Sequence, residues 1–136
     1  MAFNTRFAVS IHALVLLALE PDTLHTSEDV AQKLDTNPVV IRRIFLQLRK
    51  AGLIRSHKGP SGGSKLAHPA KEITLRDIHR AVQPQGLLHA SPNSTVHGVS
   101  AVLKAIFSDA SRAFEKELNQ TTLSQLVKKA HKKSKS

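Results

Sequence analysis

Hydrophobic and polar residues follow one another along the chain in patterns that predict mainly helices. Asn4 can cap a first helix that runs to about Leu19 and is apolar around nearly its whole circumference. A helix of this kind must be buried on more than one side. The pattern therefore indicates that a second element, or a second chain, covers it.

Two shorter helices are predicted next, separated by a tight turn. Thr26 or Ser27 can cap the first of them. After the turn at 35–37, Pro38 opens the second, which runs through Lys50. Its apolar face consists of Ile41, Ile44, Phe45 and Leu48. The basic residues point elsewhere, so this helix is amphipathic and its free side is basic.

The following segment predicts a small β-hairpin and a fourth helix. Residues 53–57 and 64–68 have the character of two short strands, and the turn between them, at 58–63, holds three glycines. A glycine-rich tip allows the backbone to approach a binding partner closely, although a simple tight turn is the alternative. Thr74 and Asp77 then form a capping box that opens the fourth helix.

A long helix is predicted near the end of the chain. Residues 83–98 are rich in Pro, Gly, Ser and Asn and indicate a loop. The helix that follows runs from about Val99 to Leu118 and carries one apolar stripe, which suggests a particular docking surface. The last residues, KKAHKKSKS, are expected to form a frayed, solubilising tail.

Basic charge concentrates in two segments. The formal net charge is +10. Between Asp35 and Glu72 there are eight Lys and Arg and no acid, and after Glu117 there are five Lys and no acid. Such blocks suggest nucleic acid or an anionic membrane surface as a partner. A solvated basic face is the alternative.

Composition excludes several classes of protein. The chain has 136 residues, enough for one domain with a short extension, and no Cys, which excludes disulfides, thiolate zinc sites and cysteine-ligated iron–sulfur clusters. The longest apolar stretch, Phe7 to Leu19, is shorter than the roughly 18 residues of a membrane span, and it lacks the flanks of a signal peptide. No nucleophile elbow, phosphate loop or carboxylate pair indicates an enzyme.

The order of these elements is that of a winged helix-turn-helix. A short helix, a tight turn, a basic amphipathic helix and a glycine-turned hairpin follow one another. The helix fits the major groove of DNA, and the hairpin tip can reach a flanking phosphate or the minor groove. Arg42 and Arg43 are placed for phosphates and guanine edges, with Arg55, Lys58 and Lys65 on the hairpin.

The helix-turn-helix and the hairpin contain EDVAQKLDTNPVVIRRIFLQLRKAGLI and then HKGPSGGSKLAHPAKEITLRDIHRAV. In these segments the chain resembles the Rrf-two family of bacterial winged-helix transcription regulators. The opening RFAVSIHALVLLAL and the helix at 99–118 are similar to that family's first and dimerisation helices. The strongest motif is RKAGLI followed by KGPSGGSKL, in which Ser64 replaces the usual aromatic residue.

The resemblance implies a recognition helix at 38–50, a minor-groove cation at Lys58 and a homodimer. From the recognition helix and the wing together we expect DNA contacts by Asn37, Val39, Val40, Arg42, Arg43, Gln47, Arg55, Lys58, Ser61 and Lys65. The implied dimer interface comprises Val99, Val102, Leu103, Ile106, Phe107, Ala110 and Phe114.

Cluster-binding members of that family hold three cysteines in the loop before the long helix. The corresponding loop here, QPQGLLHASPNSTVHG, has none, so we expect no cofactor. Its His89 and His97 match no standard metal-ligand spacing and are expected to be surface polar residues. His12 is expected to be a hydrogen-bonded imidazole in the core or in an interface.

We therefore expect a mainly α-helical protein with a small β-hairpin wing. The expected parts are a winged helix-turn-helix at 1–83, a loop at 84–98, a dimerisation helix region at 99–127 and a basic tail at 128–136. The expected function is that of a cytoplasmic, homodimeric repressor on a near-palindromic DNA operator, with no membrane partner. A small-molecule effector stays open.

Two other functions fit the same basic surface. The first is an RNA- or ribosome-associated winged-helix protein, although five Phe and no Tyr or Trp argue against single-strand stacking. The second is an interaction module whose long helix binds a different protein.

Overall fold

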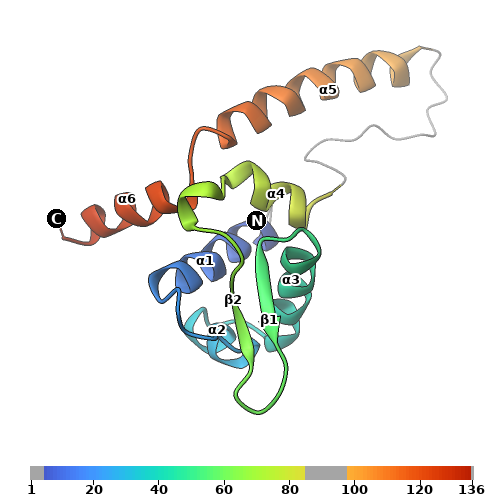
Figure 1. The fold of residues 1–136 in the computed structure, drawn as a ribbon. Coiled ribbons are helices and arrows are strands. Elements are labelled where there is room, and N and C mark those ends of the chain that lie inside the picture. The colour runs from blue at the N-terminus through green and yellow to red at the C-terminus, as the bar shows by residue number, and fades with distance from the viewer. Residues whose placement is uncertain (1–4, 85–97, 136) are drawn as a thin grey trace.

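The computed structural model describes residues 5–84 and 98–135. The helices are α1 (Thr5–Leu19), α2 (Ser27–Lys33), α3 (Pro38–Lys50), α4 (Leu75–Val82), α5 (Val99–Leu118) and α6 (Leu123–Lys135), with a one-turn 3-10 helix η1 (Ala70–Glu72). Strands β1 (Ile54–His57) and β2 (Gly63–Leu66) form one antiparallel hairpin. The first four helices and the hairpin make one body, from which α5 projects (Figure 1). The predicted fold class is confirmed.

Helix α1 lies at the centre of this body. It contacts α3, α4, α6 and β2, and its Ala13, Leu14 and Leu17 are fully buried. Other apolar residues of α1 are half-buried against the same core, so the prediction that other elements cover this helix is confirmed. His12 is hydrogen-bonded as expected, with Nδ1 2.8 Å from the Ala8 carbonyl oxygen, but it is exposed and lies outside the core.

Side-chain caps fix where the two helices of the helix-turn-helix begin. The Thr26 hydroxyl accepts a hydrogen bond from the Asp29 amide, and the Asn37 side chain accepts one from the Val39 amide at 2.8 Å. Pro38 occupies the first turn of α3, and the chain leaves α3 through Gly52 with φ +79°, in the left-handed region. The cap at Thr26 and the start of α3 at Pro38 are as predicted, whereas the cap at Asn37 was not predicted from the sequence.

Backbone pairing ties the hairpin to the segment before α2. The His25 amide donates to the Ser64 carbonyl at 2.9 Å, and the Ser64 amide donates to the His25 carbonyl at 2.8 Å. Next to this bridge, a Cβ on Gly63 would lie 2.9 Å from the His25 carbonyl oxygen, and Gly63 has φ +153°. Only glycine fits this close approach without displacing backbone.

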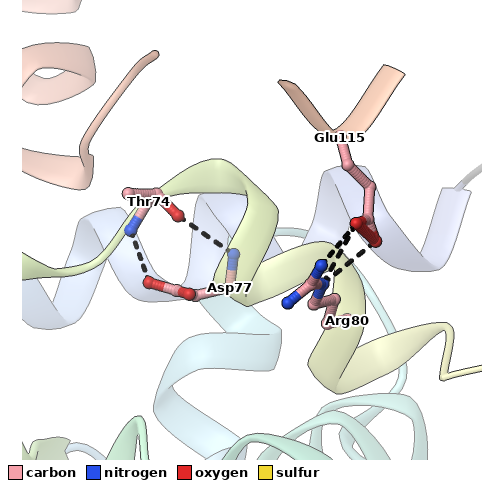
Figure 2. A network of polar contacts seen from close by, with 4 residues as sticks. All are labelled: Thr74, Asp77, Arg80 and Glu115. Carbon is pink, nitrogen blue, oxygen red and sulfur yellow. Dashed lines mark hydrogen bonds and ion pairs between the residues drawn. The ribbon is translucent and has the colours of Figure 1, made fainter. Parts of the chain in front are cut away.

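Polar contacts fix the start of α4 and join its end to α5. Thr74 and Asp77 form the predicted capping box at the start of α4 (Figure 2). Near the end of α4, the Arg80 guanidinium donates to both carboxylate oxygens of Glu115 on α5, with a shortest distance of 2.6 Å. The hydrogen bond from Arg80 is the main cause that lowers the pKa of Glu115, so this carboxylate stays ionised.

A cluster of three edge-on rings beside this ion pair fixes the end of α5 against α1 and α4. His79 of α4 is 1% exposed and lies edge-on to Phe7 of α1 and to Phe114 of α5, with ring centroids 5.0 Å apart in both pairs. Burial lowers the pKa of His79, against smaller raising effects of the Gln83 hydrogen bond and of Glu115. Burial therefore favours the neutral form of this imidazole. Phe114, assigned to the dimer interface from the sequence, thus packs within its own chain.

The lysine-rich end of the chain is helical and not a frayed tail. Thr122 and Gln125 form a reciprocal cap, in which the Gln125 amide donates to the Thr122 hydroxyl and the Thr122 amide donates to the Gln125 side chain. Leu123 is fully buried, and its amide donates to the Ile73 carbonyl at 2.7 Å. The expected division between residues 127 and 128 therefore falls inside α6. No helix of the described residues is long and apolar enough to cross a membrane.

We predict that Glu115→Gln lowers the free energy of unfolding by about 1 kcal/mol, because the charge-assisted pair with Arg80 is lost. Glu117→Gln is the matched control, since the Glu117 carboxylate has no ion-pair partner among the described residues. Urea denaturation of both variants measures the effect. Equal midpoints for the two variants would show that the pair adds nothing to the docking of α5.

We also predict that Gly63→Ala lowers the free energy of unfolding by about 2 kcal/mol, because the added methyl group collides with the His25 backbone. Gly59→Ala is the control: its φ of +108° is also strained for alanine, but a Cβ there meets nothing within 4 Å. Thermal unfolding of both variants compares them. If both lose the same stability, the contact with His25 contributes nothing and only backbone strain matters.

Candidate nucleic-acid interface

The side of α3 that faces away from the core collects several of the predicted DNA-contacting residues. Ile41, Ile44 and Leu48 are fully buried against the body, and this fixes the rotation of the helix. On the free side, Val39, Val40 and Leu46 are 44%, 37% and 41% exposed, and Arg42 and Arg43 are also exposed. Asn37 is exposed at the amino end, where its side chain caps the helix.

Arg42 and Arg43 differ in their surroundings. Arg42 lies on the flank next to α2, and its guanidinium forms an ion pair with Glu28 at 3.0 Å. Both partners are more than half exposed, so the pair contributes at most about 1 kcal/mol and can open for another anion. Arg43, about 100° further around the helix, has no ion-pair partner in the described part of the chain. Arg43 is therefore one of the free cations on the outward face of α3.

Gln47 does not lie with these residues. Its side-chain amide donates to the Val82 carbonyl of α4 at 3.4 Å, and its Oε1 is buried without a hydrogen-bond partner in the structure. The side chain is half-buried where α3 meets α4. The prediction that Gln47 contacts DNA is thus not supported by its position.

The wing has two sides with different residues. Strand pairing sets Ser56 opposite Ser64 on the side toward α3, where their hydroxyl oxygens are 2.8 Å apart. Arg55 and Lys65 lie opposite each other in the strand register, on the other side of the hairpin. Arg55 also lines a cavity of about 460 Å³ next to the end of α1. The hairpin therefore separates Arg55 and Lys65 from the cations of α3. Lys58 and Ser61 are exposed in the turn.

A groove of about 590 Å³ lies between α3 and the wing. Its lining includes Arg42, Arg49, His57 and Lys58, and none of its described lining residues is an acid. Cations that gather in a concave surface attract anions more strongly than the same charges spread over a flat face. The groove is therefore suited to a polyanion that lies along the outer side of α3.

Arg49 is missing from the residues predicted from the sequence, although it lines this groove. A local signal exists: Arg49 follows Arg42 by seven residues, which is two helical turns, so both fall on one flank of α3. Its guanidinium donates to the Ser56 hydroxyl of the wing at 3.1 Å. Arg49 thus bridges α3 and the wing.

Comparisons with known proteins agree with this geometry. A family model described as Rrf2, iron-dependent transcriptional regulator, matches residues 3–129. The HTH-type transcriptional regulator YwnA of Bacillus subtilis (strain 168) is 36% identical over 130 residues, which cover 91% of this chain and 96% of that protein.

Two solved structures share the fold. CymR of Staphylococcus aureus is 27% identical, with a TM-score of 0.68, and the alignment covers 90% of this chain and 95% of that one. IscR of T. potens is 24% identical, with a TM-score of 0.70, and the alignment covers 93% of this chain and 85% of that one.

The residues present do not fit an iron centre of the thiolate kind, because the sequence contains no Cys. Within residues 5–84 and 98–135, no group of three or more His, Asp or Glu is arranged to hold a metal ion. His89 and His97 lie outside the described residues. The described residues therefore offer no ligand set for the iron named in the family description.

The chain combines a helix-turn-helix, a wing and a cation-lined groove between them. It matches the family model over nearly its whole length, as the sequence resemblance implied. The protein therefore belongs to the Rrf2 family and is a DNA-binding, winged-helix transcriptional regulator.

Proposed function

We propose that this regulator acts as a repressor that binds a near-palindromic DNA operator as a homodimer and without an iron–sulfur cluster. One observation carries the proposal: the solvent-facing side of α3 lies directly beside a groove lined by cations from α3 and the wing. A helix inserted into the major groove needs a free face for the bases and nearby cations for the phosphates.

The free face of α3 has the composition expected for reading base edges. Val39 and Leu46 are exposed apolar side chains of a kind that can contact the methyl group of thymine. Arg43, which lacks a carboxylate partner in the described structure, can donate two hydrogen bonds to the O6 and N7 atoms of guanine. Lys58 and Ser61 at the wing tip are available for the backbone or the minor groove.

The apolar stripe of α5 supports the homodimer. Val99, Val102 and Ile106 are 39%, 59% and 54% exposed, and Leu103 and Ala110 are exposed beside them. Phe107 is half-buried. A helix with this much free apolar surface is stable when another helix covers it. A second copy supplies the same stripe through a twofold axis, and the two α3 helices then meet two symmetric half-sites.

Repression follows from occupancy of an operator by such a dimer, which blocks access to the DNA beneath it. The lack of a cluster is supported by the sequence, because the chain has no Cys to ligate one.

In-vitro selection of duplex DNA by the purified chain tests the proposal, with the mass of the oligomer measured in parallel and binding repeated at two salt concentrations. We expect an enriched palindrome bound by a dimer, and transcription from a template that carries this palindrome should fall when the protein is added. Binding without an enriched motif that disappears at moderate salt would leave only a surface with general affinity for polyanions.

We predict that Arg43→Ala relaxes the base preference at one position in each half-site and weakens operator binding by about 1 to 3 kcal/mol. Lys71→Ala is the charge-matched control, because Lys71 is exposed in η1, away from the wing tip. Selection and titration with each variant give the comparison. An unchanged motif for Arg43→Ala would remove Arg43 from the base-contacting residues.

We further predict that Ile106→Glu converts the dimer to a monomer and lowers operator affinity more than tenfold, because dimerisation would bury an unpaired carboxylate. Ser108→Glu adds the same charge at an exposed position of α5 about 200° away from Ile106 on the helix, and should leave the dimer intact. Light scattering gives the mass of each variant. A dimeric Ile106→Glu variant would show that the stripe is not the interface.

A further inference from the structure

Arg49 is held in place by the Ser56 hydroxyl, which is itself hydrogen-bonded to a second hydroxyl, that of Ser64. Its Nη1 donates to the Ser56 hydroxyl at 3.1 Å, and this oxygen lies 2.8 Å from the Ser64 hydroxyl. Ser64 is 4% exposed, and its amide and carbonyl both pair with His25. A surface guanidinium is thereby connected to the backbone bridge between Ser64 and His25. Little side-chain freedom has to be lost when this guanidinium binds an anion.

The Arg49 guanidinium has N–H donors beyond the one that binds Ser56. A guanidinium carries five N–H donors, and the Ser56 hydroxyl takes one of them. Neither Arg49 nor Lys58 forms an ion pair among residues 5–84 and 98–135, whereas Arg42 is paired with Glu28. Three cations thus line one groove, and a single carboxylate from outside its lining balances one of them. The groove has room and charge for an anion.

The layout of the cations favours a row of phosphates over a single small anion. Arg42 and Arg49 are two turns apart along α3, a rise of about 10.5 Å, and Lys58 lies across the groove on the wing. One small anion cannot reach all three, but successive phosphates of one DNA strand can. Arginine is also suited to phosphate because its planar fork donates two parallel hydrogen bonds.

We propose that the groove between α3 and the wing is a phosphate seat, in which Arg49, positioned by Ser56 and Ser64, binds one backbone phosphate of the DNA. The proposal rests on the proposed function and names the chemistry of one part of that surface. A phosphate fixed between α3 and the wing sets the depth and register of α3 in the major groove. Arg49 therefore helps to place the bases opposite Arg43 but does not itself contact base edges.

The first test compares Arg49→Ala with Lys71→Ala in the full-length protein, on the selected operator and on an unrelated duplex. Arg49→Ala should weaken both complexes about tenfold and should reduce the slope of log affinity against log salt by about 0.9. Lys71→Ala should change neither quantity. An unchanged salt slope for Arg49→Ala, or a loss confined to the operator, would overturn the seat.

Neutral linkages in the DNA identify the phosphate. Single methylphosphonate linkages are placed in turn along one half-site of the operator. One position should weaken binding by the parent protein and have no further effect on binding by Arg49→Ala, because the contact is already absent. If every neutral linkage weakens both proteins equally, Arg49 contacts no phosphate and the proposal fails.

Variants of Ser56 in the wing test whether its hydroxyl positions the Arg49 guanidinium. Ser56→Ala should cause part of the loss seen for Arg49→Ala and add nothing in the double variant, and Ser56→Thr, which keeps the hydroxyl, should restore parental binding. A general structural defect would instead add to the loss of Arg49→Ala. Parental affinity of Ser56→Ala would show that the hydroxyl pair does not position Arg49.

A separate measurement distinguishes failure of the seat from failure of the proposed function. If the parent chain selects no duplex at all, DNA binding itself fails, and the groove is then titrated with inorganic phosphate against chloride at equal ionic strength. A saturable NMR shift of the Arg49 Nε–H, absent in Ser56→Ala, would support a seat for the phosphate of a free small molecule. If phosphate and chloride shift the Arg49 Nε–H signal equally, both the phosphate seat and the proposed function are contradicted.

Discussion

Two backbone hydrogen bonds between His25 and Ser64 determine how the recognition surface is assembled. An isolated two-stranded hairpin is only marginally stable in water, and this bridge adds a third strand position to the wing. The same residue, His25, directly precedes the cap of α2 at Thr26. One contact therefore fixes both the turn end of strand β2 and the start of the helix-turn-helix, and through them the width of the groove that Arg49 lines.

The buried face of α3 supplies the complementary constraint. Because Ile41, Ile44 and Leu48 are completely buried, every other residue of α3 has a determined direction. Arg42 and Arg49 share the flank toward the wing, Arg43 and Leu46 face outward, and Gln47 meets α4. Core packing alone thus gives α3 two different faces, and in the proposed complex the flank would hold the sugar-phosphate strand while the outer face would meet the bases.

Local patterns predicted what local chemistry controls. The caps at Thr26 and Thr74 and the start of α3 at Pro38 follow from short-range hydrogen bonds and backbone geometry. The directions of Gln47 and Arg55 could not be predicted in the same way, because they depend on Val82 and on strand register, contacts with distant parts of the chain. Helix α6 had a local signal in Thr122 and Gln125, but its stability also needs the burial of Leu123 beside Ile73. His79 is buried where Phe7 and Phe114, which are distant in the sequence, converge on it.

The uneven support of α5 has a consequence for how a cell could use this protein. The end of the helix is fixed by Phe114 and Glu115, whereas its earlier turns expose Val99, Val102 and Ile106. In a homodimer, association would supply the packing that these turns lack, so assembly would be tied to protein concentration. At low levels, the concentration of dimer rises with the square of the concentration of protomer. A modest change in synthesis or proteolysis would then produce a larger change in operator occupancy, and the amount of protein could itself serve as the signal.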